Sequence, residues 1–225
     1  MGLKEILLVG LGGQGPTIAG EVLVQAAIFD GKYAQSRPCY GPERRAGIVA
    51  VFYRLGEVPI RRKSLFREAD CIILMHEYFL EEFTSSGLIS SAKELEVGPV
   101  LLRVDDSVFR GMAFFGGTGI SDLTLKKGGI VIANSNLTPG EIKLKGGLQA
   151  SKIATVDANE ISMEVYGRRA IPIINTIMLG AFVKASNWLS LNSILEAVKL
   201  RWPEAAETNI KAVLKGYEDT KVLEV

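Results

Sequence analysis

Hydrophobic residues fall into short continuous runs that alternate with segments of helical spacing. The continuous runs predict strands buried on both faces at about 4–10, 71–75, 100–104, 129–133 and 153–156. Less regular patterns predict strands at 32–36 and 48–54. Apolar residues spaced three or four apart predict helices at 16–29, from about 76, from 157, and at 172–186, 191–201 and 203–217.

This alternation of strands and helices predicts an α/β protein. We expect a single Rossmann-like, doubly wound, mostly parallel sheet with helices on both faces. The length of 225 residues suits one large domain spanning residues 1–225 better than two complete ones. Asp157 to Glu160 has the pattern of a capping box, which predicts where the helix after the last parallel strand begins.

A glycine-rich turn follows the first predicted strand. Pro16 occupies the first position of the next helix, and the turn itself consists of Gly10, Leu11, Gly12, Gly13, Gln14 and Gly15. The spacing matches G-x-G-x-x-G, so a dinucleotide or another anion could bind at the helix N-terminus. A dinucleotide site normally has an acidic residue at the end of the second strand, whereas Asp30 precedes that strand here. The alternative is a tight turn that binds nothing.

Basic residues are concentrated in one part of the chain. Residues 31–67 hold nine Lys and Arg against two Glu, an excess of +7, although the whole chain carries only +1. Arg44 and Arg45 lie in a loop bounded by glycine and proline, where paired guanidiniums suit a phosphate or a carboxylate. They would serve equally well in a salt bridge to a partner subunit. The run at 61–63 is interpreted as a solvated face.

The composition excludes several kinds of chemistry. Two cysteines and one histidine are too few for an iron–sulfur cluster, a histidine zinc site or a Ser-His-Asp triad, so we expect no catalytic or metal-binding residue. His76 is expected to be structural, and basic neighbours could lower the pKa of Cys39. The near-neutral charge argues against nucleic acid, no apolar run predicts a membrane span, and the free cysteines indicate the cytoplasm.

Several motifs together resemble one family. The glycine turn at 10–15, Gly-Pro-Glu-Arg-Arg at 41–45, Phe-Tyr-Arg at 52–54, Pro-Ile at 59–60 and the late helix at 175–181 resemble the gamma subunit of the 2-oxoacid:ferredoxin oxidoreductases, which include pyruvate synthase. The likeness covers roughly residues 4–82 and 126–202. Residues 86–125 match poorly, as an insertion would, and Ala46 departs from the usual Arg-Arg-Gly.

The resemblance implies that this chain is one subunit of an enzyme complex. In this family the complex oxidatively decarboxylates a 2-oxoacid with coenzyme A as acyl acceptor, and pyruvate is the first expectation here. The complex uses thiamine diphosphate, magnesium and iron–sulfur clusters, none of which this chain would hold alone. Alpha, beta and ferredoxin-like delta subunits would be its partners, and ferredoxin the electron acceptor. The chain would assist assembly and contribute to the coenzyme A path.

The resemblance also assigns the cofactor-contacting residues. They would be Gly10, Gly12, Gly13, Gln14, Gly15, Arg44 and Arg45. Two alternatives remain open from the sequence. One is an independent nucleotide-binding Rossmann oxidoreductase, and the other is an assembly module whose glycine turn is only structural.

Overall fold

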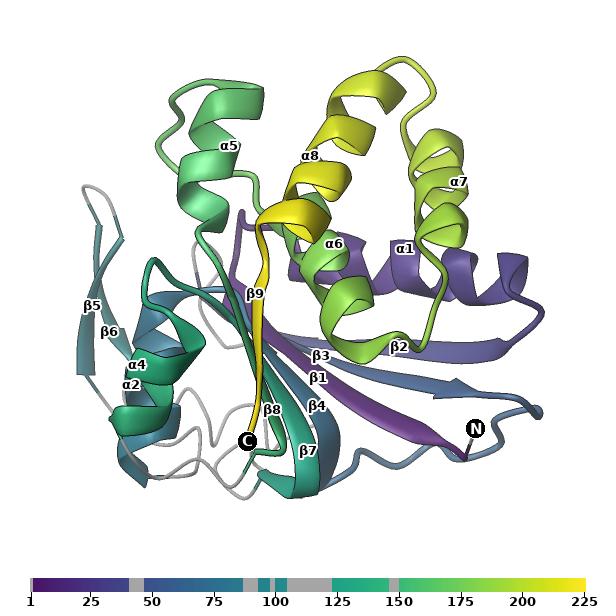
Figure 1. Cartoon of the computed structure of the whole chain (residues 1–225), viewed down its shortest axis with the longest axis horizontal. Coiled ribbons are helices and arrows are strands. Elements are labelled where there is room, and N and C mark those ends of the chain that lie inside the picture. The colour runs from purple at the N-terminus through teal and green to yellow at the C-terminus, as the bar shows by residue number, and fades with distance from the viewer. Residues whose placement is uncertain (1, 41–46, 87–92, 98–99, 105–122, 146–149) are drawn as a thin grey trace.

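One seven-stranded sheet forms the centre of the protein (Figure 1). The computed structural model describes residues 2–40, 47–86, 93–97, 100–104, 123–145 and 150–225. The strand order is β2-β3-β1-β4-β7-β8-β9, and β1, β4, β7 and β8 pair in parallel. Their bounds are Lys4–Leu11, Glu68–Leu74, Thr124–Asn134 and Lys152–Val156.

The remaining strands of this sheet are antiparallel to their neighbours. β3, Ile48–Gly56, lies between β1 and β2, Tyr33–Tyr40, and β9, Lys221–Glu224, pairs with β8 at the other edge. Because β2 is antiparallel to β3, it points the same way as β1, and so only β3 and β9 oppose the main direction. The predicted α/β fold with a mostly parallel sheet is confirmed.

Helices cover both faces of the sheet, as predicted (Figure 1). Alternate residues of β1 face opposite ways: Ile6 and Leu8 belong to one apolar core, whereas Leu7 and Val9 belong to the other. The first core lies beneath α1, α5, α6, α7 and α8, which span Pro16–Phe29, Ala158–Tyr166, Asn175–Ser186, Leu191–Arg201 and Ala206–Asp219. The second lies beneath α2, Glu77–Ser86, and α4, Pro139–Leu144.

Several elements differ from the predictions. β2 continues to Tyr40 through Pro38, which an edge strand tolerates because its free side needs no donor. The sequence analysis missed α4, although Thr138 and Glu141 form a complete capping box there, and it missed β9. The predicted strand at 100–104 is β6, Val100–Val104, but it pairs with β5, Lys93–Val97, in a separate two-stranded sheet. The Asp157 half of the predicted capping box is present, since its side chain accepts from Glu160 N at 2.9 Å.

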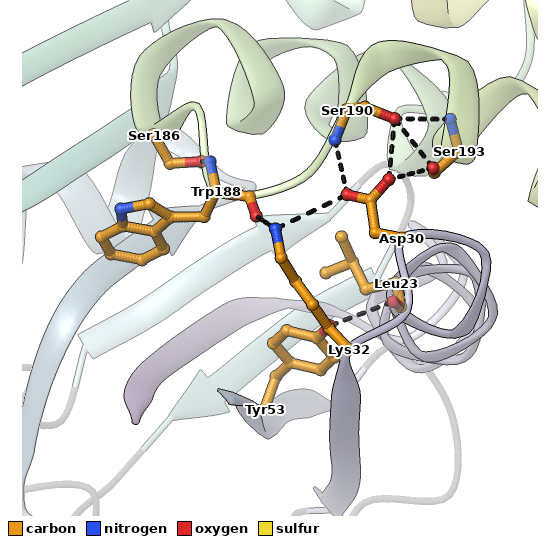
Figure 2. Close-up of polar contacts among 8 residues, drawn as sticks. All are labelled: Leu23, Asp30, Lys32, Tyr53, Ser186, Trp188, Ser190 and Ser193. Carbon is orange, nitrogen blue, oxygen red and sulfur yellow. Dashed lines mark hydrogen bonds and ion pairs between the residues drawn. The ribbon is translucent and has the colours of Figure 1, made fainter. Parts of the chain in front are cut away.

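An aspartate joins the end of α1 to the start of α7 (Figure 2). Asp30 follows α1 and accepts hydrogen bonds at 2.8 Å from both the backbone N–H and the hydroxyl of Ser190, and another from the Ser193 hydroxyl. Lys32 lies 3.7 Å from the same carboxylate and donates to the carbonyl of Trp188 at 2.6 Å. A carboxylate at a helix N-terminus is favoured by the helix dipole. Asp30 therefore fixes the loop before α7.

Two glycines let α6 and α8 touch through their backbones. A Cβ atom on Gly180 would lie 2.1 Å from the Val213 carbonyl oxygen, and one on Gly216 would lie 2.1 Å from that of Ile177. No side chain fits at either position. The crossing of these two helices is therefore fixed by the absence of side chains.

We expect Gly180→Ala to destabilise the protein by at least about 3 kcal/mol, because the added methyl group must push α8 away. Gly140→Ala is the control, since only the Thr138 hydroxyl lies near it, at 3.9 Å, and alanine favours a helix. Urea unfolding of both variants measures the difference. Equal stability of Gly180→Ala and the wild type would contradict the close crossing.

A second prediction concerns acid stability. Burial raises the pKa of Asp30, but the hydrogen bonds from Ser193 and Ser190 and the charge of Lys32 outweigh it, so the pKa lies below its usual value. A lowered folded pKa stabilises the protein above the unfolded pKa, near 3.9, and this contribution is lost as the pH falls further.

Asp30→Asn should therefore cost about 1–2 kcal/mol at pH 7 and progressively less below about pH 4. Glu204→Gln, an exposed change outside this cluster, should cost nothing measurable at either pH. Thermal unfolding between pH 3 and pH 7 measures both. If the stability difference between Asp30→Asn and the wild type stays constant across this pH range, the charge of Asp30 does not contribute to stability.

Candidate functional site

The glycine turn connects β1 to α1 at the carboxyl end of the parallel strands. Gly10 lies within β1, which ends at Leu11, and Pro16 begins α1 as predicted. Gly13 and Gly15 have φ values of 102° and 82°, in the left-handed region that favours glycine. No acidic side chain occupies the first turn of α1, so the positive end of the helix dipole is not offset there.

Gln14 is turned inward and holds the turn in place. Its side chain is 4% exposed, and its Oε1 accepts from the N–H of Leu11 at 2.9 Å. Its Nε2 donates to the carbonyl of Met75 at 3.4 Å, just beyond the end of β4. The amide group thus satisfies buried backbone atoms of two neighbouring segments. This gives the predicted contact residue Gln14 a structural task.

Protein segments fill the space beside three of the glycines. A Cβ atom on Gly10 would lie 3.1 Å from Met75 Cβ, and one on Gly13 would lie 2.9 Å from Ile171 Cδ1. On Gly15 it would lie 2.8 Å from Asn175 Nδ2, at the first turn of α6. The close approach that glycine permits is therefore one of Met75 at Gly10, and of α6 and the segment before it at Gly13 and Gly15. Ligand binding at Gly10, Gly12, Gly13 or Gly15 stays a prediction.

The basic loop begins and ends beside the glycine turn. Arg44 and Arg45 lie outside the described residues, so their predicted contact stays a prediction. The loop leaves β2 at Tyr40, whose hydroxyl lies 3.1 Å from Thr17 Oγ1 in the first turn of α1. It returns at Gly47, whose carbonyl accepts from the N–H of Gly12 at 2.8 Å. Both ends of the loop are therefore held at the N-terminus of α1.

A second arginine pair, which the sequence analysis missed, lies near the same turn. Arg168 and Arg169 are exposed and precede Ile171, the residue that packs on Gly13. Among the described residues, no carboxylate forms an ion pair with either guanidinium. Gly167, with φ of 76°, and Pro172 flank the pair, much as Gly and Pro flank Arg44 and Arg45. This shared pattern of flanking glycine and proline could have identified the second arginine pair from the sequence.

Asn134 ties together the carboxyl ends of β4 and β7 and the start of α5, and it was also missed. Its Nδ2 donates to the Met75 carbonyl at 3.1 Å and to Asn159 Oδ1 at 3.2 Å. Its Oδ1 accepts from the N–H of Ala158 at 2.9 Å, so β4, β7 and the start of α5 are joined. A hollow of about 300 Å³ beside it is lined by the acidic residues Glu77, Asp157 and Glu160. The carboxyl edge is therefore acidic between α2 and the start of α5.

The histidine and the cysteines have structural surroundings. His76 Nδ1 accepts from the N–H of Tyr78 at 3.2 Å, and burial lowers the pKa of His76 despite the charge of Glu77. The expectation that basic neighbours lower the pKa of Cys39 is wrong. Cys39 is in β2 and 5% exposed, and burial raises the pKa of its thiol more than Arg37 lowers it. Burial also raises the pKa of Cys71.

The described part of the chain contains neither a cluster of metal ligands nor a membrane-spanning helix. No group of three or more His, Cys, Asp or Glu residues is arranged there to hold a metal ion. Within the same residues, every helix is too short or too polar to cross a membrane.

Known proteins resemble this chain over nearly its whole length. The family model described as "Pyruvate ferredoxin/flavodoxin oxidoreductase" matches residues 5–98 and 120–219. The chain belongs to this family. The model passes over residues 99–119, but it matches 86–98 and 120–125, which belong to the segment expected to match poorly.

Individual relatives identify the type of subunit. The common subunit gamma of the pyruvate/ketoisovalerate oxidoreductases of Thermococcus litoralis is 33% identical over 222 residues, which are 98% of this chain and 99% of that protein. Pyruvate synthase subunit PorC of Methanothermobacter thermautotrophicus is 31% identical over 98% of both chains. The crystal structure of pyruvate oxidoreductase subunit PORC of Thermotoga maritima has a TM-score of 0.70, with 26% identity and full coverage of both chains. This protein is thus a gamma subunit of the family.

We expect Gly15→Ala to destabilise the protein through both strain and crowding. Gly31→Ala is the control, because Gly31 has φ of 67° but nothing within 4 Å of an added Cβ. Each change costs about 1–2 kcal/mol of left-handed strain. Gly15→Ala should lose roughly 2 kcal/mol more, because Asn175 blocks the methyl group. Equal losses in urea unfolding would show that α6 does not press on the turn.

Proposed function

We propose that this chain is the gamma subunit of a thiamine-dependent 2-oxoacid:ferredoxin oxidoreductase complex. The complex would oxidatively decarboxylate a 2-oxoacid, with pyruvate as the first candidate, and pass the acyl group to coenzyme A. The end-to-end likeness to the Thermococcus gamma subunit carries this proposal. That relative is named for pyruvate and ketoisovalerate together, so ketoisovalerate is the second candidate oxoacid.

The residues of this chain do not suit the redox and decarboxylation steps. Its two cysteines are both buried, and four thiolates would be needed for an iron–sulfur cluster. We therefore assign thiamine diphosphate, magnesium and the clusters to alpha, beta and ferredoxin-like delta subunits, with ferredoxin accepting the electrons. This chain contributes to assembly and to the coenzyme A path.

The basic carboxyl edge suits the phosphates of coenzyme A. Arg168 and Arg169 are exposed in the segment that leads to Ile171, which packs on Gly13 of the turn. The loop holding Arg44 and Arg45 begins and ends beside the same turn. Guanidinium groups bind phosphates through charge-assisted hydrogen bonds, and the N-terminus of α1 adds its dipole. Together these features could hold the anionic end of coenzyme A while partner subunits carry out the chemistry.

The observations favour a subunit over an independent dinucleotide enzyme. The acidic residue nearest the second strand, Asp30, is used in hydrogen bonds to Ser190 and Ser193 (Figure 2). Gln14 is likewise used within the protein. Co-expression with the alpha, beta and delta chains should give a complex that reduces ferredoxin with an oxoacid and coenzyme A. Turnover of a nucleotide substrate by the isolated chain would overturn the proposal.

The coenzyme A contact has a specific test. In the assembled complex, the double change Arg168→Ala/Arg169→Ala should raise the apparent Michaelis constant for coenzyme A roughly tenfold or more. Each lost hydrogen bond to a charged group costs about 1.5–3 kcal/mol. The Michaelis constant for the oxoacid should stay nearly unchanged. Lys143→Ala/Lys145→Ala, on exposed positions at α4, is the control. If the double arginine variant instead dissociates at lower salt with normal kinetics, the pair contacts a partner subunit.

A further inference from the structure

A second basic surface lies at the opposite end of the sheet. The segment 57–67 connects the end of β3, beside the N-terminus, to the start of β4 (Figure 1). Four of its side chains, Arg61, Arg62, Lys63 and Arg67, are cationic and exposed. Within the described residues, no carboxylate forms an ion pair with any of the four. We call this segment the amino-edge strap.

Two nearby carboxylates, the buried Glu5 and the half-buried Asp70, are already neutralised by other cations. Glu5 lies 3.0 Å from Arg54 Nε and 3.3 Å from Lys126 Nζ. Asp70 lies 2.8 Å from Lys126 Nζ and 3.6 Å from Lys4 Nζ. Two carboxylates therefore face three cations beneath the strap. The positive charge of the strap is left to interact outward.

The backbone of the strap is held by two other arginines. Arg54, 6% exposed, donates from Nη1 to the Arg62 carbonyl at 3.4 Å. Arg37 donates from Nη1 to the Lys63 carbonyl at 2.6 Å. Phe66 is buried edge-on against Phe52, with ring centroids 4.9 Å apart. A charged loop that only needs solvation gains little from such anchoring, whereas a binding surface gains because less order is lost on association.

The strap has features of a protein interface. Val58, 70% exposed, places an apolar side chain beside the cations, and interfaces combine apolar centres with polar rims. Residues 61–67 can span up to about 20 Å, which is more than one phosphate group covers. The only aromatic residue of the strap, Phe66, is buried, so no ring in it is available to stack on nucleic acid bases.

We propose that the amino-edge strap docks an acidic surface of a partner subunit. Carboxylates on the partner would pair with Arg61, Arg62, Lys63 and Arg67, and an apolar side chain would cover Val58. This contact rests on the proposed function, because it requires an assembled complex. It is separate from the coenzyme A path, which lies at the carboxyl end of the strands.

The test is charge reversal in the complete complex. Arg61→Glu/Arg62→Glu/Lys63→Glu should raise the dissociation constant of the gamma subunit at least tenfold at low salt, measured by native mass spectrometry or gel filtration. The difference should shrink as salt screens the contact. Lys143→Glu/Lys145→Glu/Lys211→Glu makes the same change in net charge at exposed positions elsewhere, and should dissociate like the wild type. Unchanged thermal unfolding of the isolated variant shows that it folds.

The outcomes separate the two proposals. If the wild type forms no complex with alpha, beta and delta chains, the proposed function fails and this contact fails with it. If the wild-type complex forms and the strap variant dissociates like the wild type, or both variants weaken equally, only the strap contact is overturned. Copurification of RNA with the wild-type chain but not with the strap variant would also overturn it, in favour of nucleic acid.

Discussion

The close contact of α6 with α8 determines the geometry of the rest of the helical layer. Every residue of α6 except Lys184 is buried, and the helix packs against α1, α5, α7, α8 and the sheet. Because Gly180 and Gly216 carry no side chains, α8 can cover it with backbone touching backbone. That crossing fixes the amino end of α6, where Asn175 presses on Gly15 and Ile171 on Gly13. The shape of the glycine turn thus depends on two glycines in a different part of the molecule.

The two ends of the sheet carry different polar arrangements. At the carboxyl end, amide side chains of Gln14 and Asn134 bind backbone atoms, and Arg168 and Arg169 are exposed in the segment that leads to the turn. At the amino end, a buried ion pair of Glu5 with Arg54 and a half-buried pair of Asp70 with Lys126 support a basic segment. Breaking such a buried pair leaves a charge without compensation, so these groups are more sensitive to change than surface pairs. Under the two proposals above, the subunit uses both ends, the carboxyl end for coenzyme A and the amino end for a partner.

The site was only partly predictable from local sequence. The glycine spacing and Pro16 correctly placed the turn between β1 and α1. The local sequence did not predict that Cys39 is buried, because Pro38 and the surrounding polar residues are typical of a loop. Pairing with β3 extends β2 past that proline, and burial then controls the thiol. Arg168 and Arg169 had a recognisable pattern, but only the packing of Ile171 on Gly13 brings them near the turn.

The sequence by itself determined the parallel strands, most helices, the glycine turn and the family, since these depend on local hydrophobic period, backbone freedom and short motifs. The tertiary structure decided which groups fill the space that glycine leaves. Asn175 and Ile171 lie far from residues 10–15 in the chain, and no local pattern encodes such a contact. It also decided the pairing of Arg54 with Glu5 and the anchoring of the amino-edge strap. Hydrogen bonds and burial between distant segments arise only when the sheet and helices pack together.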